Sequence, residues 1–485
     1  MKVETSKKVL SSVELLQNLQ NSKSNLIKQK KILDKKDGHQ YPIIKQPFVI
    51  PSTWTWCYLS DISIIQEGPG IRKHQYETSG IQFLTVTNIL EDNIDLEKSK
   101  KYISDDQYKV YEHFTINKGD IVTACSGGSW GKSAIYDLDD KLILNTSTLR
   151  IRFYDDLGDN KYLYYLTKTS HFRGSLSKHL TGQQPNYGYS HYSKILVPLP
   201  PLPEQQRIVA ILDEAFAAID KAKANAEQNL RNAKELFESY LRGVFEKKGK
   251  MSVLGFIGVK DKQDLKINKK KILQSSNLEN PDSDNEDGWE EKTLAQISNT
   301  FGRGKSKHRP RNWDGLYGGK YPFIQTGDIR NCDHYITEYS QTYNDIGLAQ
   351  SKLWKAGTIC ITIAANIAET GILTFDACFP DSVIGIEVNE KYADRDFVEY
   401  LLQSFKVRIQ ALGKGSAQAN INMGTFENEL FPFPSVKQQQ TIVQKLDALS
   451  TETKKLETLY QQKINDLDEL KKSILAKAFS GKLKI

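Results

Sequence analysis

The richest basic cluster in the sequence is RGKSKHRPRNW, residues 303–313. Lysine and arginine side chains neutralise phosphates, and arginine or asparagine can make paired hydrogen bonds to guanine or adenine in the major groove of DNA. A solvated charged loop is the alternative interpretation. The repeated architecture described below favours a nucleic-acid contact, which we expect from Arg303, Lys305, Lys307, His308, Arg309, Arg311 and Asn312.

Two segments in the first half of the chain are suited to contact a phosphate backbone. Arg72, Lys73 and Tyr76 belong to a weaker basic cluster, RKHQY. Residues 126–133, SGGSWGKS, resemble a phosphate-binding loop after a strand, but a serine stands where such a loop has its first glycine. We therefore expect a turn that faces nucleic acid through Ser129 and Lys132 rather than a nucleotide site.

Two amide-rich loops, GQQPNY at residues 182–187 and GSAQAN at residues 415–420, occupy comparable places in the two halves. Glutamine and asparagine can read adenine or hydrogen-bond phosphate, but they can also cap the entry of a helix and tie a domain to it. Both interpretations stay open for Gln183, Gln184, Asn186, Tyr187, Gln418 and Asn420.

Several patterns imitate catalytic sites. Pro281 and Asp282 followed by EEK at residues 290–292 imitate a metal-dependent nuclease, but they straddle an acidic linker rather than strands that could hold Mg²⁺. QPNY reverses the order of the adenine methyltransferase motif, Asn/Asp-Pro-Pro-aromatic, and the histidines lack HExxH spacing. We expect no catalytic, cofactor or metal site in this chain.

The elements that must position these loops are two copies of one long pattern. Residues 198–248 begin PLPPLPEQQRIV, and residues 432–482 begin PFPSVKQQQTIV at a constant offset of 234. The prolines give each copy an extended entry, and we expect Gln205 and Gln206 to serve the helix start and contacts to other subunits. At ~1.5 Å per residue, each copy predicts a helix of roughly 67 Å.

Apolar residues recur in both copies with the spacing of threes and fours that marks a coiled-coil seam, so the two helices are expected to bury each other. The first seam comprises Ile208, Leu212, Ala215, Ile219, Ala222, Ala226, Leu230, Ala233, Phe237, Tyr240 and Val244. The second comprises Ile442, Leu446, Leu449, Leu456, Tyr460, Ile464, Leu467, Ile474 and Ala478, with breaks at Thr453 and Lys471.

Matched landmarks extend the repeat to the globular parts, for example Leu59 and Ile62 against Leu294 and Ile297. The predicted fold class is α+β, with two globular mixed α/β domains separated by two long antiparallel coiled-coil helices in a pseudo-twofold internal repeat. Its segments are an N-terminal helical segment (1–40, with Val13, Leu16, Leu19 and Ile27 as its apolar stripe), a first domain (41–200), a long helix (201–248), a linker (249–287), a second domain (288–433) and a C-terminal long helix (434–485).

Composition narrows the class of protein. The 485 residues include 66 Lys and Arg against 59 Asp and Glu, an excess that permits a nucleic-acid partner. The five cysteines form no CxxC pair, which argues against a disulfide framework or a zinc site. We expect a cytoplasmic protein, because no apolar run approaches the ~18 residues of a membrane span.

These landmarks resemble, over essentially the full length, the specificity subunit of type I restriction-modification enzymes. The marks that carry the resemblance are PLPPLPEQQRIV, its altered copy PFPSVKQQQTIV and the paired amide-rich loops GQQPN at Gly182 and GSAQAN at Gly415. Ser435, Lys437 and Gln438 depart from the stronger pattern of the first copy, but the helical register survives.

The resemblance implies two target-recognition domains, each binding one half of a split double-stranded DNA sequence, with the helices fixing the spacer. It implies no active site in this chain. Two methyltransferase subunits and two translocase/nuclease subunits would supply the chemistry, with S-adenosylmethionine, and ATP with Mg²⁺, bound by those partners. A single-chain nuclease or methyltransferase and a purely protein-bridging scaffold are the alternatives.

Overall fold

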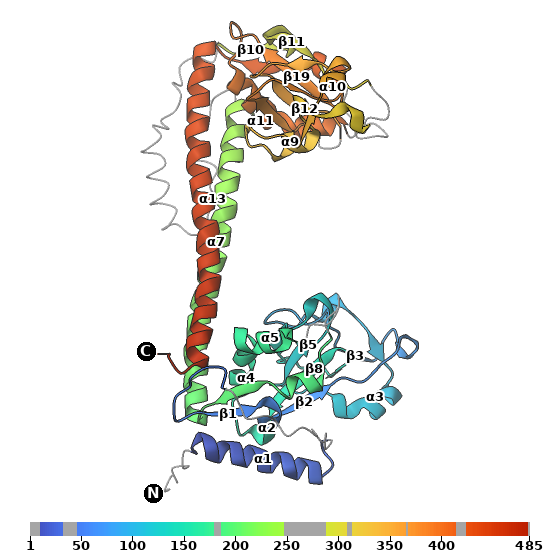
Figure 1. The fold of residues 1–485 in the computed structure, drawn as a ribbon, viewed down its shortest axis with the longest axis vertical. Coiled ribbons are helices and arrows are strands. Elements are labelled where there is room, and N and C mark those ends of the chain that lie inside the picture. Colours follow the sequence, from blue (N-terminus) through green and yellow to red (C-terminus); the bar gives the residue numbers. More distant parts are fainter. Residues whose placement is uncertain are drawn as a thin grey trace. The chain divides into compact units, whose positions relative to one another are not determined.

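The computed structural model describes residues 10–32, 46–178, 186–246, 288–307, 313–364, 367–413 and 423–483. The chain divides into two compact units, Met1–Asn225 with Lys463–Ile485, and Ala226–Gln462. Each unit contains one globular domain and a part of each of the two long helices, α7 (Leu202–Glu246) and α13 (Val436–Phe479) (Figure 1). The predicted linker, residues 249–287, lies outside the described residues.

The domain of the first unit is built on an antiparallel sheet with the strand order β2-β8-β5-β6. Its strands are β2 (Ser63–Glu67), β8 (Thr148–Phe153), β5 (Ile121–Ala124) and β6 (Ser133–Ile135). A smaller sheet contains β4 (Tyr102–Ile103), β3 (Ile81–Phe83) and β7 (Leu142–Ile143), and β1 (Thr55–Tyr58) pairs with β9 (Leu196–Leu199) just before α7. The helices are α1 (Ser12–Lys28), α2 (Leu59–Ile62), α3 (Asp105–Tyr111), α4 (Asn160–Thr167), α5 (Ser170–Ser177) and α6 (Tyr189–Tyr192).

The domain of the second unit has a sheet of order β11-β19-β16-β17-β13. Its strands are β11 (Ser298–Arg303), β19 (Val383–Val388), β16 (Ile359–Thr362), β17 (Thr370–Leu373) and β13 (Tyr335–Ile336). A second sheet contains β14 (Gln341–Tyr343), β12 (Tyr317–Phe323), β18 (Ala377–Cys378) and β15 (Leu353–Trp354), and β10 (Glu290–Lys292) pairs with β20 (Phe431–Phe433). The helices are α9 (Thr326–Asn331), α10 (Asp345–Ala349), α11 (Arg395–Gly413) and α12 (Met423–Glu427).

The two domains share one topology. The order β2-β8-β5-β6 corresponds to β11-β19-β16-β17, and in both smaller sheets one strand has an antiparallel and a parallel neighbour. The pair β1-β9 corresponds to β10-β20. The predicted α+β class with an internal repeat is thereby confirmed, and strands β13 and β15 distinguish the second domain.

Each domain shares its hydrophobic core with the long helices. In the first unit, Ile151 and Leu163 belong to the same buried cluster as Ile208 and Leu212 of α7 and Phe479 of α13. In the second unit, one cluster joins the sheet to both helices and includes Ile361, Ile384, Leu401, Val244, Phe245, Ile442 and Leu446. Removing this apolar surface from water stabilises the attachment of domain to helix.

The helices α7 and α13 run antiparallel. Within the first unit, Lys223 Nζ lies 2.6 Å from Asp468 Oδ1, and Lys471 Nζ lies 3.1 Å from Asp220 Oδ1. Lys471, predicted as a break in the seam, places its ammonium 4.8 Å from the ring centre of Phe216. A lysine stem can cover apolar surface while its charge stays paired, so this break is accommodated.

The N-terminal helix α1 begins with a capping box in which Ser11 and Glu14 satisfy each other's backbone N–H groups. The buried side chains are Ser12, Leu15 and Leu19. Val13, predicted in the apolar stripe, is 64% exposed. The predicted stripe is confirmed at Leu19, which is completely buried, and Leu16 packs against the same core, whereas its assignment is wrong at Val13. The period alone does not say which side of a short helix meets the domain. Within the described residues, no helix is long and apolar enough to cross a membrane.

Candidate nucleic-acid interface

Four strand ends meet at one edge of the main sheet in the first unit. The pairs Glu67–Leu149, Ala124–Thr148 and Thr123–Ser133 stand opposite each other, so β2 and β5 end where β6 and β8 begin. The segments 68–73, 125–132 and 144–147 therefore leave the sheet at the same edge. Segment 186–188 joins them, because Tyr187 N–H donates to Cys125 O at 2.8 Å.

We call these four segments the first loop surface. Its parts are held together by backbone hydrogen bonds from Gly68 N to Thr148 O, 3.0 Å, and from Cys125 N to Ser147 O, 2.8 Å. A β-bridge joins Ser126 to Asn186. The segment SGGSWGKS and the last two residues of QPNY, Asn186 and Tyr187, were singled out separately in the sequence and are thus adjacent in space.

The predicted contact residues lie differently on this surface. Arg72, Lys73 and Asn186 are exposed, and Ser129 and Lys132 are partly exposed. All five side chains are accessible to a partner, and their contacts to nucleic acid stay a prediction. They are presented by turns whose backbone is fixed by the sheet edge, which is a suitable arrangement for reading a rigid duplex.

One predicted contact residue lies behind this surface. Tyr187 is 2% exposed, and its ring packs 5.3 Å from that of Trp130, so it supports the loops rather than facing a partner. Tyr76 packs with its ring 5.1 Å from Phe83 but keeps part of its side chain exposed. A contact from Tyr76 to nucleic acid therefore stays a prediction.

The segment that resembles a phosphate-binding loop forms a β-hairpin turn. A 3-10 turn at Gly127–Ser129 leads into β6, which pairs antiparallel with β5. A phosphate-binding loop instead leads into a helix whose N-terminal N–H groups bind the anion. The turn interpretation of this segment agrees with the structure.

The second unit has the same edge. The pairs Arg303–Ile384, Thr362–Val383 and Ile361–Thr370 place the ends of β11 and β16 beside the starts of β19 and β17. The segments that leave this edge, 304–307, 363–364, 367–369 and 380–382, form what we call the second loop surface. Gly304 N–H donates to Val383 O at 2.9 Å, which closes the first of these segments against the last.

Three predicted cations extend from the second loop surface. Arg303, Lys305 and Lys307 are exposed. Arg303 Nε donates to Asp381 O at 2.7 Å, and Gln350 Oε1 accepts from the backbone N–H of Lys307 at 2.6 Å. These bonds fix the backbone of the segment. The remaining predicted residues, Gln183, Gln184, His308, Arg309, Arg311, Asn312, Gln418 and Asn420, lie outside the described residues.

Lys352 is a cation near this surface that the sequence did not single out. Its ammonium lies 3.2 Å from the ring centre of Trp354. Burial, and further the positive charge of Lys305, lower the pKa of Lys352 despite the opposing charge of Glu387. The only sequence signal was an isolated SKLW, without a neighbouring basic cluster.

Each domain is attached to its long helix by a buried glutamine at the helix entry. Gln205 Oε1 accepts from Asp159 N–H at 3.0 Å while its Nε2 donates to Pro200 O at 2.9 Å. Gln439 makes the same two bonds, from Asp394 N–H at 2.7 Å and to Pro434 O at 2.8 Å. Both glutamines are completely buried. The expectation that Gln205 serves the helix start is confirmed, but the expectation that it contacts another subunit is wrong, because its buried amide is used within the unit. Gln206 is exposed, and a subunit contact from it stays a prediction.

A tyrosine–aspartate pair forms a second attachment two turns further along each helix. The Tyr165 hydroxyl donates to Asp213 Oδ1 on α7, and the Tyr400 hydroxyl donates to Asp447 Oδ1 on α13 at 2.7 Å. Burial, followed by the hydrogen bond to the carboxylate, raises the pKa of both phenols, so both donate over the physiological range. The offset of 234 between the two helix patterns aligns Asp213 with Asp447, but it does not show that either touches a tyrosine.

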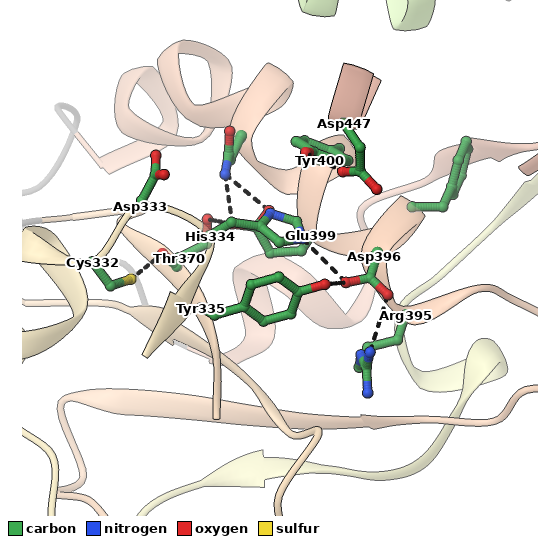
Figure 2. A network of polar contacts seen from close by, with 12 residues as sticks. Cys332, Asp333, His334, Tyr335, Thr370, Arg395, Asp396, Glu399, Tyr400 and Asp447 are labelled. Carbon is green, nitrogen blue, oxygen red and sulfur yellow. Dashed lines mark hydrogen bonds and ion pairs between the residues drawn. The ribbon is translucent and has the colours of Figure 1, made fainter. Parts of the chain in front are cut away.

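A polar network surrounds Tyr400 (Figure 2). His334 Nε2 lies 3.1 Å from Asp396 Oδ1, and His334 Nδ1 lies 2.6 Å from Glu399 Oε2, a charge contact rather than a well-aligned hydrogen bond. Burial disfavours the charged imidazolium, but these two carboxylates outweigh it and raise the pKa of His334 to about 9. The first unit has an ion pair of a different composition. There Asp92 Oδ1 lies 2.8 Å from Nζ of Lys168, the C-cap residue of α4, so the acidic group is in the loop and the basic group is at the helix.

Comparison with known proteins decides the family. Residues 51–229 and residues 286–466 each match the family described as Type I restriction modification DNA specificity domain. The chain belongs to this family. Its two matches include the two loop surfaces and most of both long helices, so the resemblance read from the sequence is confirmed.

Relatives in this family match almost the whole chain. The putative type I restriction enzyme MjaX specificity subunit of Methanocaldococcus jannaschii is 23% identical over 445 residues, which covers 90% of this chain and 95% of the relative. The type I restriction enzyme EcoBI specificity subunit of Escherichia coli is 23% identical over 462 residues, which covers 90% and 87%.

Solved structures share the fold. A chain from a study of complex assembly and conformational transition of the type I R-M system aligns with a TM-score of 0.67 and 19% identity, covering 90% of this chain and 100% of that one. The HsdS subunit from Thermoanaerobacter tengcongensis aligns with a TM-score of 0.56 and 19% identity, covering 91% and 100%.

Proposed function

We propose that this chain is the non-catalytic DNA specificity subunit of a type I restriction-modification complex. Each domain binds one half of an asymmetric bipartite site in double-stranded DNA. The observation that carries the proposal is the pair of loop surfaces, which leave the same edge of the same sheet in both units but carry different residues. Equivalent scaffolds with different loops suit two different half-sites.

The chemistry of the two loop surfaces agrees with this role. Exposed cations, among them Arg72, Lys73, Arg303, Lys305 and Lys307, neutralise phosphates and set the position of the domain on the duplex. Asn186, exposed beside Ser126, has an amide suited to an adenine edge. If the two half-sites lie about one helical turn apart, ~34 Å, both domains can contact the same face of the DNA.

The long helices set the spacer in this proposal. Each helix continues from one unit into the other, so its length is a fixed number of residues at ~1.5 Å each. Deleting one heptad from both helices removes roughly 10 Å, about three base pairs, and should shorten the preferred spacer while the half-sites stay the same. An unchanged spacer would contradict this part of the proposal.

The outward polar faces of the helices are the proposed docking sites for two methyltransferase subunits, with two restriction subunits completing the assembly. S-adenosylmethionine, and ATP with Mg²⁺, would be bound by those partners. The relatives named above are called specificity subunits of type I restriction enzymes. That name supports the same assignment here.

Sequencing of methylated bases in the genome, with and without the gene for this chain, tests the proposal. The expected result is one asymmetric split motif whose methylation disappears with the chain. Methylation that depends on the partner subunits but not on this chain would refute it. Cofactor-dependent methylation by the purified chain alone would instead support a single-chain enzyme.

A further inference from the structure

We infer that the Tyr165–Asp213 and Tyr400–Asp447 hydrogen bonds are positioning contacts that determine how strictly the spacer between half-sites is read. This inference rests on the proposed function. Each bond joins a globular domain to one particular residue of a long helix, so it selects one position of the domain along that helix. These residues are positioning residues and need not touch DNA.

The apolar core alone does not select that position strongly. Contacts among leucine, isoleucine and phenylalanine side chains are non-directional, and a shift of the domain along a coiled-coil surface replaces one apolar contact by another. A hydrogen bond to a carboxylate has a narrow distance and angle, and its loss leaves a buried hydroxyl without a partner. The polar pair therefore supplies the positional selectivity that the apolar surface lacks.

The orientation of each tyrosine ring is itself fixed. The Tyr165 ring packs edge-on against Phe216 of α7, with centroids 5.4 Å apart. The Tyr400 ring stacks on the imidazole of His334, with centroids 4.5 Å apart, and His334 lies between Asp396 and Glu399 (Figure 2). Tyr400 also packs edge-on against Phe237 of α7, with centroids 6.1 Å apart, so both tyrosines meet an aromatic ring of a long helix. In both units the hydroxyl position is therefore fixed by the packing of its ring.

A second ionic contact accompanies each pair. Lys161 Nζ lies 2.7 Å from Asp213 Oδ2 in the first unit. In the second unit, Asp333 on the domain forms an ion pair with Lys454 of α13, seven residues beyond Asp447. With the glutamines at the helix entries, the first domain is thus held at two positions of α7, Gln205 and Asp213. The second domain is held at three positions of α13, Gln439, Asp447 and Lys454. Polar contacts at more than one position along a helix resist both sliding and tilting of the domain.

The consequence concerns DNA register. One base pair corresponds to ~3.4 Å of rise and about 35° of twist, and one helical residue to ~1.5 Å, so a domain that moves by about two residues along its helix is displaced by one base pair and no longer matches its half-site. A firmly attached domain accepts one spacer, whereas a loosely attached domain accepts neighbouring spacers as well. Spacer tolerance is therefore the property that these contacts should control.

The test uses the full chain bound to its methyltransferase partner and duplexes with the native spacer or one base pair more or fewer. In Tyr400→Phe, which removes only the hydroxyl, the affinity ratio between native and altered spacers should fall by roughly tenfold, the factor expected for one lost hydrogen bond to a charged group. Asp447→Ala, at an exposed helix position, should give the same loss, and the double variant no more than either alone.

Tyr321→Phe is the matched control, because its hydroxyl also donates to an aspartate, Asp345 at 3.0 Å, but within the domain and away from the His334 network. It should keep the spacer preference of the wild type. Equal spacer ratios in wild type and Tyr400→Phe, or an equal loss in Tyr321→Phe, would overturn the inference.

A second measurement does not involve DNA. Spin labels on Lys109→Cys and Lys320→Cys, both at exposed positions in different domains, report the distribution of distances between them. The native cysteines are buried or, for Cys332, have a pKa raised to about 12 chiefly by burial, so they label slowly. Tyr400→Phe should broaden this distribution, and an unchanged width would refute the inference. Loss of sequence preference in the wild type would refute only the proposed function.

Discussion

The imidazole of His334 lies stacked on the phenol ring of Tyr400, with ring centroids 4.5 Å apart and an interplanar angle of 27°. His334 belongs to the segment that leads into β13, and Tyr400 belongs to α11. The hydroxyl of the same tyrosine reaches Asp447 on α13. The titratable side chain of His334 therefore contacts the same tyrosine that attaches the domain to the long helix.

This contact predicts a pH dependence of stability. The pKa of His334 is raised to about 9 in the folded chain, against about 6.5 when unfolded, so its stabilising charge is fully present below pH 6.5 and is lost as the pH rises toward 9. The change amounts to at most about 3 kcal/mol. In urea titrations between pH 6.5 and 9, the unfolding free energy of the second unit should depend less on pH in His334→Gln than in the wild type. An unchanged slope in the variant would contradict the assigned charge.

The carboxylate of Asp396 in the same network predicts the opposite pH dependence of stability. Burial of Asp396 is outweighed by its hydrogen bonds to His334 and Tyr335 and by Arg395, so its pKa is lowered. Stability from this carboxylate is present above its unfolded pKa of about 3.9 and is lost as the pH falls below it. His334→Gln should therefore leave a smaller acid-side loss than the wild type.

Replacing Asp120 is expected to lower the stability of the first unit strongly. Asp120 is completely buried, with its carboxylate oxygens 3.2 Å from Arg150 and 3.5 Å from Arg152. Asp120→Ala should lower the free energy of unfolding by about 3 kcal/mol, because it leaves the largely covered guanidinium of Arg150, 15% exposed, without its carboxylate. Asp139→Ala, which breaks an exposed pair with Lys118, is the control and should change nothing measurable.

Leu446 and Leu459 of α13 give a matched pair for the shared core of the second unit. Leu446 is completely buried and Leu459 is 58% exposed. Leu446→Ala should cost roughly 2–5 kcal/mol because a cavity remains between helix and domain. Leu459→Ala should cost far less in the same denaturation experiment, and equal costs would show that the domain does not share its core with the helix.

Gly68 and Gly70 test the first loop surface. A Cβ atom at Gly68 would lie 2.2 Å from the backbone oxygen of Asn145, whereas one at Gly70 meets nothing within 4 Å. Gly68→Ala must displace segment 68–73 from segment 144–147. It should weaken specific DNA binding by roughly tenfold, which corresponds to a loss of about 1.4 kcal/mol of binding free energy. Gly70→Ala should bind as the wild type does; equal losses would argue against this surface as the interface.

Lys305 and Lys307 test the second loop surface through salt dependence. If both neutralise phosphates, replacing both by alanine should reduce the slope of log affinity against log salt by about 2, with little change in sequence preference. Replacing Lys320 and Lys355, two exposed lysines elsewhere in the same domain, by alanine provides the comparison of equal charge. A slope unchanged by the double substitution would exclude phosphate contacts from these lysines.

The sequence alone was sufficient for the fold class and the family. A constant offset of 234 between two helix patterns is a local, linear signal, and helix register survives substitutions that keep apolar residues at the seam. It also identified the clusters at Arg72 and Arg303, since charge is visible residue by residue. How each residue of those clusters contacts DNA stays a prediction.

Tertiary structure decided which of these residues share a surface and which lie beneath it. Tyr187 reads as a companion of Asn186 in the sequence, yet it is buried against Trp130 because strand pairing turns successive side chains to opposite sides. Gln205 reads as a surface residue of a helix start, yet its amide is used by Asp159 and Pro200. The sequence determined the periodic and repeated elements, whose causes are local. Contacts such as Tyr400–Asp447 depend on how sheets and helices far apart in the chain pack, and no spacing in the sequence encodes that directly.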